Sequence, residues 1–565
     1  MLRGNITTWM GRPDFPVLAH LHAPQGPAKG AVVLCPPLGR EQVASYRTLR
    51  QLGDALARKG LLAVRFTWTG QSDSAPMDPS LSLLDNWRAD LAAVVEQLRG
   101  AGVERVHLAG LRLGALLAAA QAAELDIASL LLWDAVPSGR HFLRYEQAMY
   151  ASDGLSGDGS EDFHGLGYTL RKADGEELRA LKLKGLTLPE VPTATIVRAG
   201  GASDPGAYPG TDGVWSSDEQ IAMLETSSMT AAVPARTVAS IVSWYSSIAG
   251  EADQELHLEP RPVAEFDVPA PGQGRHAAMV RVRESVVELP TGLLGILTEP
   301  VDQEPDQSVL YVAASSEPLD GPSGLWAISA REVAALGGCG LRVDKHGTGE
   351  LGGPLPTDPM PYMPAFVDDV ATAARWLAAH TGTKPIGVGM CSSVYFEIVR
   401  PNGLLFSKVV GINLLAFDRN PADIPDEVAM ATDPSHLDHT GEEGAAPGAT
   451  RKQRLRAGLK TNMPQPLWRT LGRLGKAHAP DDFLREAALD TELVLAFSPE
   501  DFGALAAQRG EAAIAWARRT GAPFQAIVDP ELDHALFGVR ARRRSCQLIR
   551  DELLRSRRLR ATLGS

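Results

Sequence analysis

One order of sequence landmarks occurs twice along the chain, and this duplication constrains the fold more than any other feature. In each half, short apolar runs bounded by turn residues alternate with amphipathic helical patterns. Each half has an arginine within its second apolar run (Arg65, then Arg342) and a short glycine-flanked motif after its third (residues 110–114, then 389–393). Self-similarity across so long a stretch indicates a duplicated domain and not a solenoid of short repeats.

The apolar runs have the length of buried strands. They are residues 31–35, 61–66, 106–109, 130–133 and 195–198 in the first half, and 309–312, 341–343, 386–389, 409–414 and 493–497 in the second. Strands that alternate with helices indicate a parallel sheet with helices on both faces. We therefore predict the α/β fold class, with two tandem domains that each contain a mostly parallel sheet.

Composition along the chain indicates where the domains meet. Residues 251–275 are rich in Pro, Glu, Asp and Gly without a clear period, which predicts a linker between domains at 1–250 and 276–565. Two longer insertions, at roughly 139–190 and 418–490, precede the last strands of each half. We expect both to form caps over the C-terminal edge of their sheets, because loops of that length usually carry function or helices of their own.

Overall composition argues against several classes of protein. The 565 residues carry a net charge of −13, which disfavours nucleic-acid binding. The four cysteines lie far apart and form no CxxC pair, so we expect no metal site, no disulfide framework and no cofactor. The N-terminus has no apolar core of a signal peptide, and no apolar stretch is long enough to span a membrane. We therefore expect a cytoplasmic location.

The motif in the second half has a reactive residue at its centre. Residues 389–393 read Gly-Met-Cys-Ser-Ser, which follows the G-x-nucleophile-x-G pattern of a strand–turn–helix elbow, with Ser393 in place of the last glycine. Such a turn lifts the central side chain above the sheet, and a thiolate at Cys391 attacks carbonyl groups well. The alternative is a buried, inert cysteine, since free cysteines are commonly buried.

Two further residues stand where partners of Cys391 are expected. Asp501 follows the strand 493–497, and His534 follows the apolar run 525–528, so the chain order is nucleophile, acid, base. This order predicts a catalytic triad of Cys391, His534 and Asp501. Taken singly, Asp501 is equally compatible with a helix cap and His534 with a surface loop.

An acyl-transfer site also needs hydrogen-bond donors for the oxyanion. The residue after the nucleophile supplies one backbone N–H, here that of Ser392. The loop after the strand 309–312 supplies the other, and we assign this role to the N–H of Ala314.

The first half lacks these groups. Its motif reads Gly-Leu-Arg-Leu-Gly at residues 110–114, and arginine cannot act as a nucleophile at neutral pH. No histidine occurs between His164 and His257, so the base is missing as well. Arg112 could bind an anionic ligand, or it could form a structural ion pair with Asp204 or Asp134.

Both halves resemble the serine aminopeptidase-like branch of the α/β-hydrolase superfamily. More narrowly, they are similar to the two bacterial hydrolases associated with exosortase and exopolysaccharide gene clusters. One of these has a G-L-R-L-G-A elbow, matched by residues 110–115, and the other has a cysteine elbow, matched by residues 389–393. The resemblance implies a bacterial chain in which two such hydrolases are fused. Glu350 departs from the family pattern, which has small polar residues at this position.

Two functions are compatible with these residues. The first is an acyl hydrolase or acyltransferase that acts on a small-molecule ester, thioester or amide through a thioacyl-enzyme at Cys391. The second is a catalytically inactive scaffold or ligand-binding protein, in which both domains have lost the chemistry. The sequence does not determine the substrate or the oligomeric state.

Overall fold

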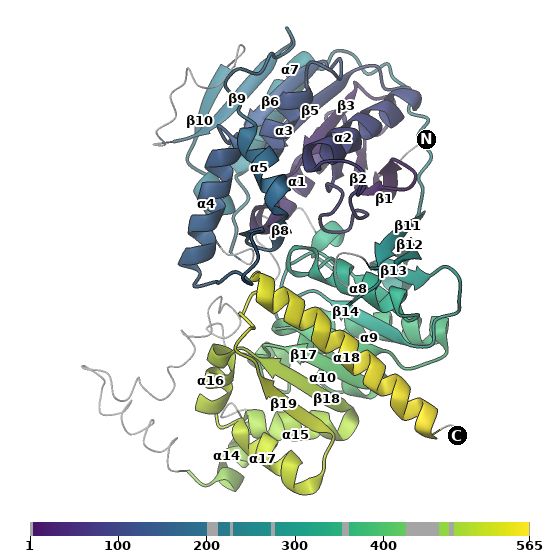
Figure 1. Ribbon diagram of the computed structural model, residues 1–565, viewed down its shortest axis with the longest axis vertical. Coiled ribbons are helices and arrows are strands. Elements are labelled where there is room, and N and C mark those ends of the chain that lie inside the picture. Colours follow the sequence, from purple (N-terminus) through teal and green to yellow (C-terminus); the bar gives the residue numbers. More distant parts are fainter. Residues whose placement is uncertain are drawn as a thin grey trace, which may run out of the picture.

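The computed structural model describes residues 4–199, 213–226, 230–272, 277–352, 361–424, 463–473 and 479–563. Two α/β domains are stacked along the long axis of the molecule, the first above the second in Figure 1. Each contains a mostly parallel sheet with helices on both faces, so the predicted fold class is confirmed.

The first sheet has eight strands in the order β1-β2-β4-β3-β5-β6-β9-β10. Only β1 and β2 run antiparallel to their neighbours. The strands are β1 (Gly4–Gly11), β2 (Pro16–Ala23), β3 (Ala31–Cys35), β4 (Leu62–Phe66), β5 (Val106–Leu111), β6 (Ser129–Trp133), β9 (Thr193–Arg198) and β10 (Gly213–Ser217). The sheet is covered by α1 (Gly39–Ala57), α2 (Leu83–Gly100), α3 (Leu113–Gln121) and α7 (Ala235–Ile248).

The second sheet repeats this order and has one additional strand at its start, β11-β12-β13-β15-β14-β16-β17-β18-β19. Its strands are β11 (Val263–Pro269), β12 (Met279–Glu288), β13 (Leu294–Pro300), β14 (Ser308–Val312), β15 (Cys339–Val343), β16 (Ile386–Met390), β17 (Lys408–Ile412), β18 (Glu492–Phe497) and β19 (Phe524–Val528). The principal helices are α8 (Leu325–Ala335), α9 (Ala365–Thr381), α10 (Ser392–Ile398), α15 (Pro480–Asp490), α16 (Pro499–Ala507), α17 (Glu511–Thr520) and α18 (Val539–Leu563).

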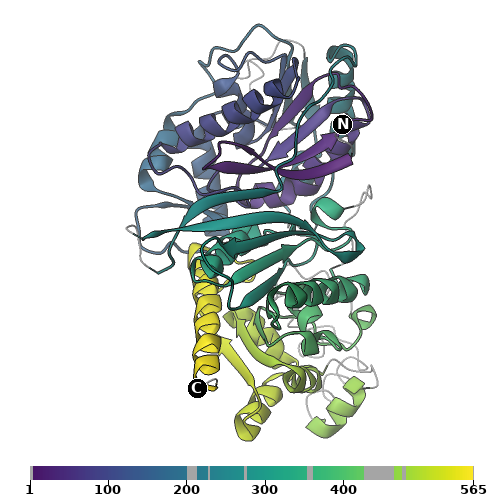
Figure 2. The same ribbon diagram turned by 90° about the vertical axis from the view of Figure 1, so that its right-hand side faces the viewer.

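The predicted linker requires a correction, because β11 lies within residues 251–275. This strand pairs antiparallel with β12 and forms the edge of the second sheet. Alternate side chains, Phe266 and Val268, are buried, and Phe266 packs against Trp9 of the first domain at 5.8 Å between ring centroids. The many Pro, Glu and Asp residues conceal this alternation in the sequence. Figure 2 shows β11 and β12 running between the two sheets.

The two insertions carry secondary structure of their own. The first contains α4 (Gly139–Ser152), the hairpin β7 (Phe163–Gly165) and β8 (Tyr168–Leu170), and α5 (Lys172–Ala180). Tyr145 of α4 stacks on the guanidinium of Arg112 at 5.4 Å, so this cap covers the C-terminal edge of its sheet. Of the second insertion, the described part includes α14 (Gln465–Arg473) and α15. Residues 425–462 lie outside the described residues.

The two predicted elbows are equivalent turns. Arg112, between β5 and α3, has φ 55° and ψ −118°, and Cys391, between β16 and α10, has φ 48° and ψ −118°. Positive φ is costly for residues other than glycine, so the strained turn persists in both domains. The turn also requires a small neighbour, because a Cβ at Gly110 would lie 2.3 Å from the backbone of Ala115.

Two ion pairs with a reciprocal arrangement join the domains. Arg65 on β4 of the first domain donates to Glu350 of the second, and Arg342 on β15 of the second pairs with Asp73 of the first at 3.1 Å. The two arginines occupy corresponding strands, and each carboxylate follows the arginine of its own domain at the same spacing. Such an exchange is the contact pattern of an isologous, two-fold interface. The duplicated domains are therefore packed as pseudo-symmetric partners.

Each arginine is also held within its own domain, and there the two halves differ. Arg65 donates to His22, which bonds to Asp54 of α1 at 2.7 Å. Arg342 pairs with Glu284, which also binds Arg331 of α8. The corresponding helices therefore contribute an acidic residue in the first domain and a basic residue in the second. The interface is pseudo-symmetric, but its surroundings are not.

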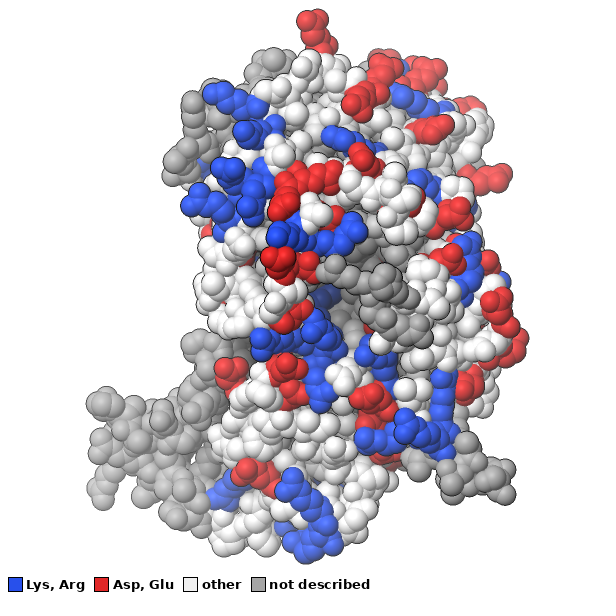
Figure 3. Space-filling model, viewed as in Figure 1, with Lys and Arg blue, Asp and Glu red and all other residues white. Residues whose placement is uncertain are grey.

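Acidic and basic side chains are intermingled over the outer face of the molecule in Figure 3.

We predict that Glu350→Gln lowers the free energy of unfolding by about 3–5 kcal/mol, because it leaves the buried guanidinium of Arg65 without its charge partner. Burial by itself would raise the pKa of Glu350, but Arg65, His20 and His22 lower it well below its ordinary value, so the ionised form is the one held here. Chemical denaturation of the full chain measures the loss. Asp85→Asn, which removes an exposed pair with Arg88, is the matched control and costs under about 1 kcal/mol. Equal costs for the two variants would contradict the prediction.

Candidate active site

Cys391 has the most accessible thiol in the chain. It is partly exposed, whereas Cys35, Cys339 and Cys546 are buried. Burial raises the pKa of Cys339 to about 12 and also raises the pKa of the other two buried thiols. The backbone N–H of Cys391 donates to Ile412 of the neighbouring strand at 2.8 Å, which fixes the elbow at the end of the sheet.

Asp501 and His534 meet at the same edge of the sheet. Asp501 lies in the first turn of α16, directly after β18, and its carboxylate accepts a hydrogen bond from Ser498 Oγ at 2.6 Å. The other carboxylate oxygen lies 2.8 Å from His534 Nδ1. His534 lies in the loop between β19 and α18. Three strand ends thus bring together the three residues singled out in the sequence.

The imidazole of His534 lies between an acid and a thiol. Burial alone would lower the pKa of His534, but its interactions with Asp501 and Cys391 outweigh burial and raise the pKa well above its ordinary value. Since Nδ1 faces Asp501, the opposite ring nitrogen, Nε2, is the one available to the thiol.

Asn413, at the end of β17, connects the acid and the base. Its side-chain N–H groups donate to the backbone carbonyls of Asp533 and His534 at 2.9 and 3.2 Å, and its carbonyl accepts from the N–H of Ser498 at 2.8 Å. Asn413 has φ 54°, a conformation that asparagine tolerates better than most residues. Sequence reasoning missed it. The available signal was a polar residue inside the apolar run 409–414.

The loop after β14 is held by side chains from two other elements. Ser392 Oγ accepts from the N–H of Ser315 at 2.8 Å, and Lys345 Nζ donates to the carbonyl of Ala313 at 2.6 Å. Because a trans peptide directs its C=O and N–H in opposite directions, Lys345 also sets the direction of the Ala314 N–H. Within the described residues, the N–H groups of Ala314 and Ser392 donate to no other group.

Lys345 was not anticipated from the sequence. It is buried, and burial lowers its pKa to about 8, against the opposing effect of nearby carboxylates such as Asp344. Its ammonium also lies over the ring of Phe366 at 5.2 Å. A buried lysine that follows a strand end looks like any charged loop residue in sequence, so only the fold reveals its contact.

Aromatic residues form one wall beside the thiol. The hydroxyl of Tyr362 is buried, and burial raises the pKa of Tyr362 well above its ordinary value, with a further contribution from Cys391. Its ring packs edge-on against Tyr395, which stacks on Phe483 at 5.7 Å. The phenol of Tyr362 therefore lies close to the sulfur and belongs to a buried aromatic cluster.

The equivalent position in the first domain is filled by ion pairs. Arg112 Nε donates to Glu41 at 2.8 Å, and its Nη1 lies 3.5 Å from Asp134, which also pairs with Arg198. Of the two ion-pair partners considered from the sequence, Asp134 is in place, and Asp204 lies outside the described residues. An anion that binds Arg112 would have to compete with two carboxylates already present.

Among the residues that the structure describes, no group of three or more His, Cys, Asp or Glu side chains could hold a metal ion. No helix among the described residues has both the length and the apolar character needed to cross a membrane.

Comparisons with known proteins are sparse at the level of sequence. No protein-family model matches the chain, and no curated protein matches it significantly. Solved structures that match include a lid-less α/β serine hydrolase from Xanthomonas campestris (17% identity, TM-score 0.28) and Est1E from Butyrivibrio proteoclasticus with bound ferulic acid (14%, 0.32). A third is a soluble variant of the monoglyceride lipase from Saccharomyces cerevisiae (12%, 0.33).

These matches span 44%, 42% and 44% of this chain, and 94%, 96% and 98% of the respective structures. The α/β fold of both domains is established by their own strand order and by the two elbows.

Arg112→Ala is predicted to lower the free energy of unfolding by about 3–5 kcal/mol, because it leaves the buried carboxylate of Glu41 without a counter-ion. Arg112→Lys keeps the charge and should lose less. Denaturation of both variants beside the wild type gives the comparison. An alanine variant as stable as the wild type would show that the ion pairs contribute nothing and would favour a ligand-binding role for Arg112.

Proposed function

We propose that the second domain is an acyl hydrolase or acyltransferase with Cys391 as nucleophile, His534 as general base and acid, and Asp501 as the group that orients His534. The observation that carries this proposal is the position of His534, which lies 2.8 Å from a buried carboxylate on one side and interacts with the partly exposed thiol of Cys391 on the other. The substrate class is a small-molecule ester, thioester or amide.

The reaction would proceed in two halves. Cys391 Sγ gives its proton to His534 Nε2 and forms a bond to the substrate carbonyl carbon. The N–H groups of Ser392 and Ala314 bind the oxyanion. When the tetrahedral intermediate collapses, the bond to the leaving alcohol, thiol or amine breaks, and His534 returns the proton to it, which leaves a thioacyl-enzyme.

In the second half, His534 takes a proton from water or another acceptor, which attacks the thioester carbon. The C–S bond then breaks and Cys391 recovers its proton. Water as the acceptor gives hydrolysis, and any other nucleophile gives acyl transfer. Asp501 keeps the Nδ1 proton in place throughout, so that Nε2 remains the nitrogen that faces the sulfur.

The first domain, which we assign to residues 1–250, would be non-catalytic. Its elbow carries Arg112, and among its described residues no histidine lies in the loop before α7, where the second domain has His534 before α18. The catalytic domain is assigned to residues 276–565.

We expect incubation with a panel of aryl esters and acyl thioesters to give a covalent acyl adduct on Cys391, because the sulfur is the accessible nucleophile at the elbow. Intact-protein mass spectrometry followed by peptide mapping detects it. Cys391→Ala should abolish adduct and turnover, and Cys391→Ser should retain little. Cys339→Ala, at a buried cysteine, is the control and should behave like the wild type. Full activity of Cys391→Ala would leave the inactive scaffold as the better assignment.

Asp501→Asn should lower the pKa of His534 toward its ordinary value, because it removes a carboxylate that raises this pKa. Histidine-selective NMR of the variant and the wild type measures the change. Turnover should fall by about 10²-fold or more, since the imidazole loses its orienting carboxylate. An unchanged pKa of His534 would exclude Asp501 from the site.

A further inference from the structure

The loop that carries His534 is in contact with the cap of the first domain. The N–H of Gly167, in the turn between β7 and β8, donates to the carbonyl of Phe537 at 3.1 Å. The N–H of Val539, the first residue of α18, donates to the hydroxyl of Tyr150 on α4 at 3.0 Å. Figure 1 shows β8 beside the start of α18. The first domain therefore contacts residues three and five positions after His534.

Charged groups extend this contact along the first turns of α18. Arg543 forms an ion pair with Asp158 of the cap, and Arg540 donates to the carbonyl of Gly157 at 2.9 Å. The approach is close, because a Cβ at Gly538 would lie 3.2 Å from the side chain of Leu155.

Within its own domain the His534 loop is held by side chains at both of its ends. Asn413 binds the carbonyls of Asp533 and His534, and the carboxylate of Asp533 accepts from the N–H groups of Phe537 and Gly538. Leu536 has φ 55°, which is strained for a residue other than glycine. The contacts that fix the far end of this strained loop include those from Tyr150 and Gly167, both in the other domain.

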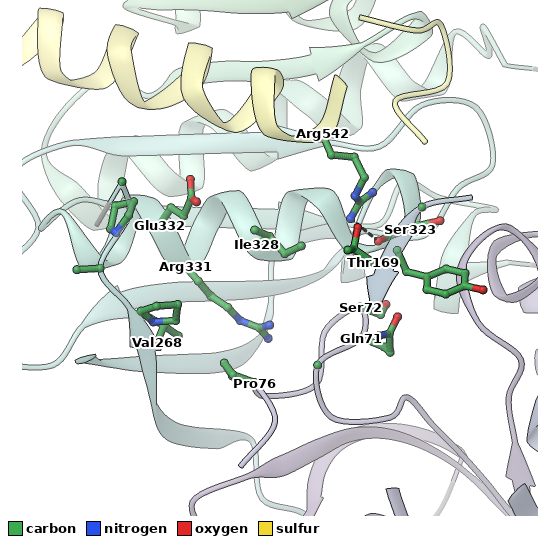
Figure 4. A pocket seen from close by; sticks show the side chains of 17 residues that line it. Gln71, Ser72, Pro76, Thr169, Val268, Ser323, Ile328, Arg331, Glu332 and Arg542 are labelled. Carbon is green, nitrogen blue, oxygen red and sulfur yellow. Dashed lines mark hydrogen bonds between the residues drawn. The ribbon is translucent and has the colours of Figure 1, made fainter. Parts of the chain in front are cut away.

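Packing around this junction is incomplete. A cavity of about 520 Å³ lies between the domains, lined by cap residues such as Thr169 and by Ser323 and Arg542 of the second domain. Figure 4 shows Arg542 directed at Ser323 across from Thr169, and its guanidinium donates to the carbonyls of Pro322 and Ser323. The cavity adjoins α18 at Arg542, among the residues of that helix that the cap contacts.

The helix that carries Tyr150 is itself anchored. Tyr145, on the same helix, stacks on the ion-paired Arg112 at the non-catalytic elbow. The elbow of the first domain thus supports the helix that reaches the second.

We propose that the cap of the first domain is a positioning element for the base of the second domain. Tyr150 and Asp158 hold residues 537–543 in place, so that the imidazole of His534 stays between Asp501 and Cys391. Neither residue touches the reacting atoms. The proposal rests on the function proposed above, and it assigns a role to a domain that has no nucleophile or base of its own.

The test uses the full chain with Tyr150→Phe, Asp158→Asn and the two combined. Tyr150→Phe removes a single oxygen and leaves the buried ring, so folding should be preserved. We expect the double variant to lose about tenfold in kcat with little change in KM, since a displaced base slows proton transfer without altering substrate binding. Asp158→Glu, which restores the charge, should recover part of the loss.

Two variants in the same cap serve as matched controls. Tyr168→Phe removes a hydroxyl that donates to Glu146 of the first domain, and Glu161→Gln removes an exposed pair with Lys172. Both should keep wild-type kcat, because the contacts that they remove lie within the first domain.

A second readout does not depend on turnover. Histidine-selective NMR, with the signal assigned through His534→Gln, gives the pKa of His534. The double variant should lower this pKa toward its ordinary value, because the ring moves away from Asp501 and Cys391, and the controls should not. If both the pKa and kcat stay at wild-type values in the folded double variant, the positioning role is wrong even though the enzyme is active. If the wild type shows no turnover but the variants lower the pKa, the positioning role stands and the proposed function fails.

Discussion

The two reciprocal ion pairs between the domains are the contacts on which the rest of the architecture depends. Arg65–Glu350 and Arg342–Asp73 place a buried guanidinium of each domain against a carboxylate of the other. Buried charges are costly unless paired, so these pairs are satisfied only when the domains adopt one relative orientation. That orientation brings the cap of the first domain to the His534 loop of the second. The interface therefore determines the surroundings of the candidate active site.

The candidate site itself follows from parallel strands that end at one edge of a sheet. Cys391, Asp501 and His534 come from chain positions far apart, and each lies just after a strand. Supporting residues then restrict their freedom. Asn413 ties the helix of the acid to the loop of the base, and Lys345 orients the peptide that presents the Ala314 N–H. Because such supports fix the geometry in advance, the proposed reaction would need little reorganisation.

The first domain has the same elbow geometry as the second, with an arginine at its centre. Arg112 holds the strained turn between β5 and α3. The space that a substrate would need is occupied by the pairs with Glu41 and Asp134, and α4 is packed over them. These contacts hold α4 in place. The proposed role of Tyr150 and Asp158 depends on that fixed position and requires no reactive group.

The sequence by itself determined the duplicated α/β order, both elbows, and the three residues that meet at the second elbow. These were predictable because strand ends are local features, and residues at the ends of parallel strands necessarily converge on one edge. It did not reveal β11, whose alternation is concealed by Pro, Glu and Asp, nor the contacts of Asn413 and Lys345. The domain interface and the link from Tyr150 to Val539 were decided only by the tertiary structure. Such contacts join residues hundreds of positions apart, and a hydrogen bond or ion pair between them leaves no periodicity or spacing in the chain, because it depends on how the two domains pack.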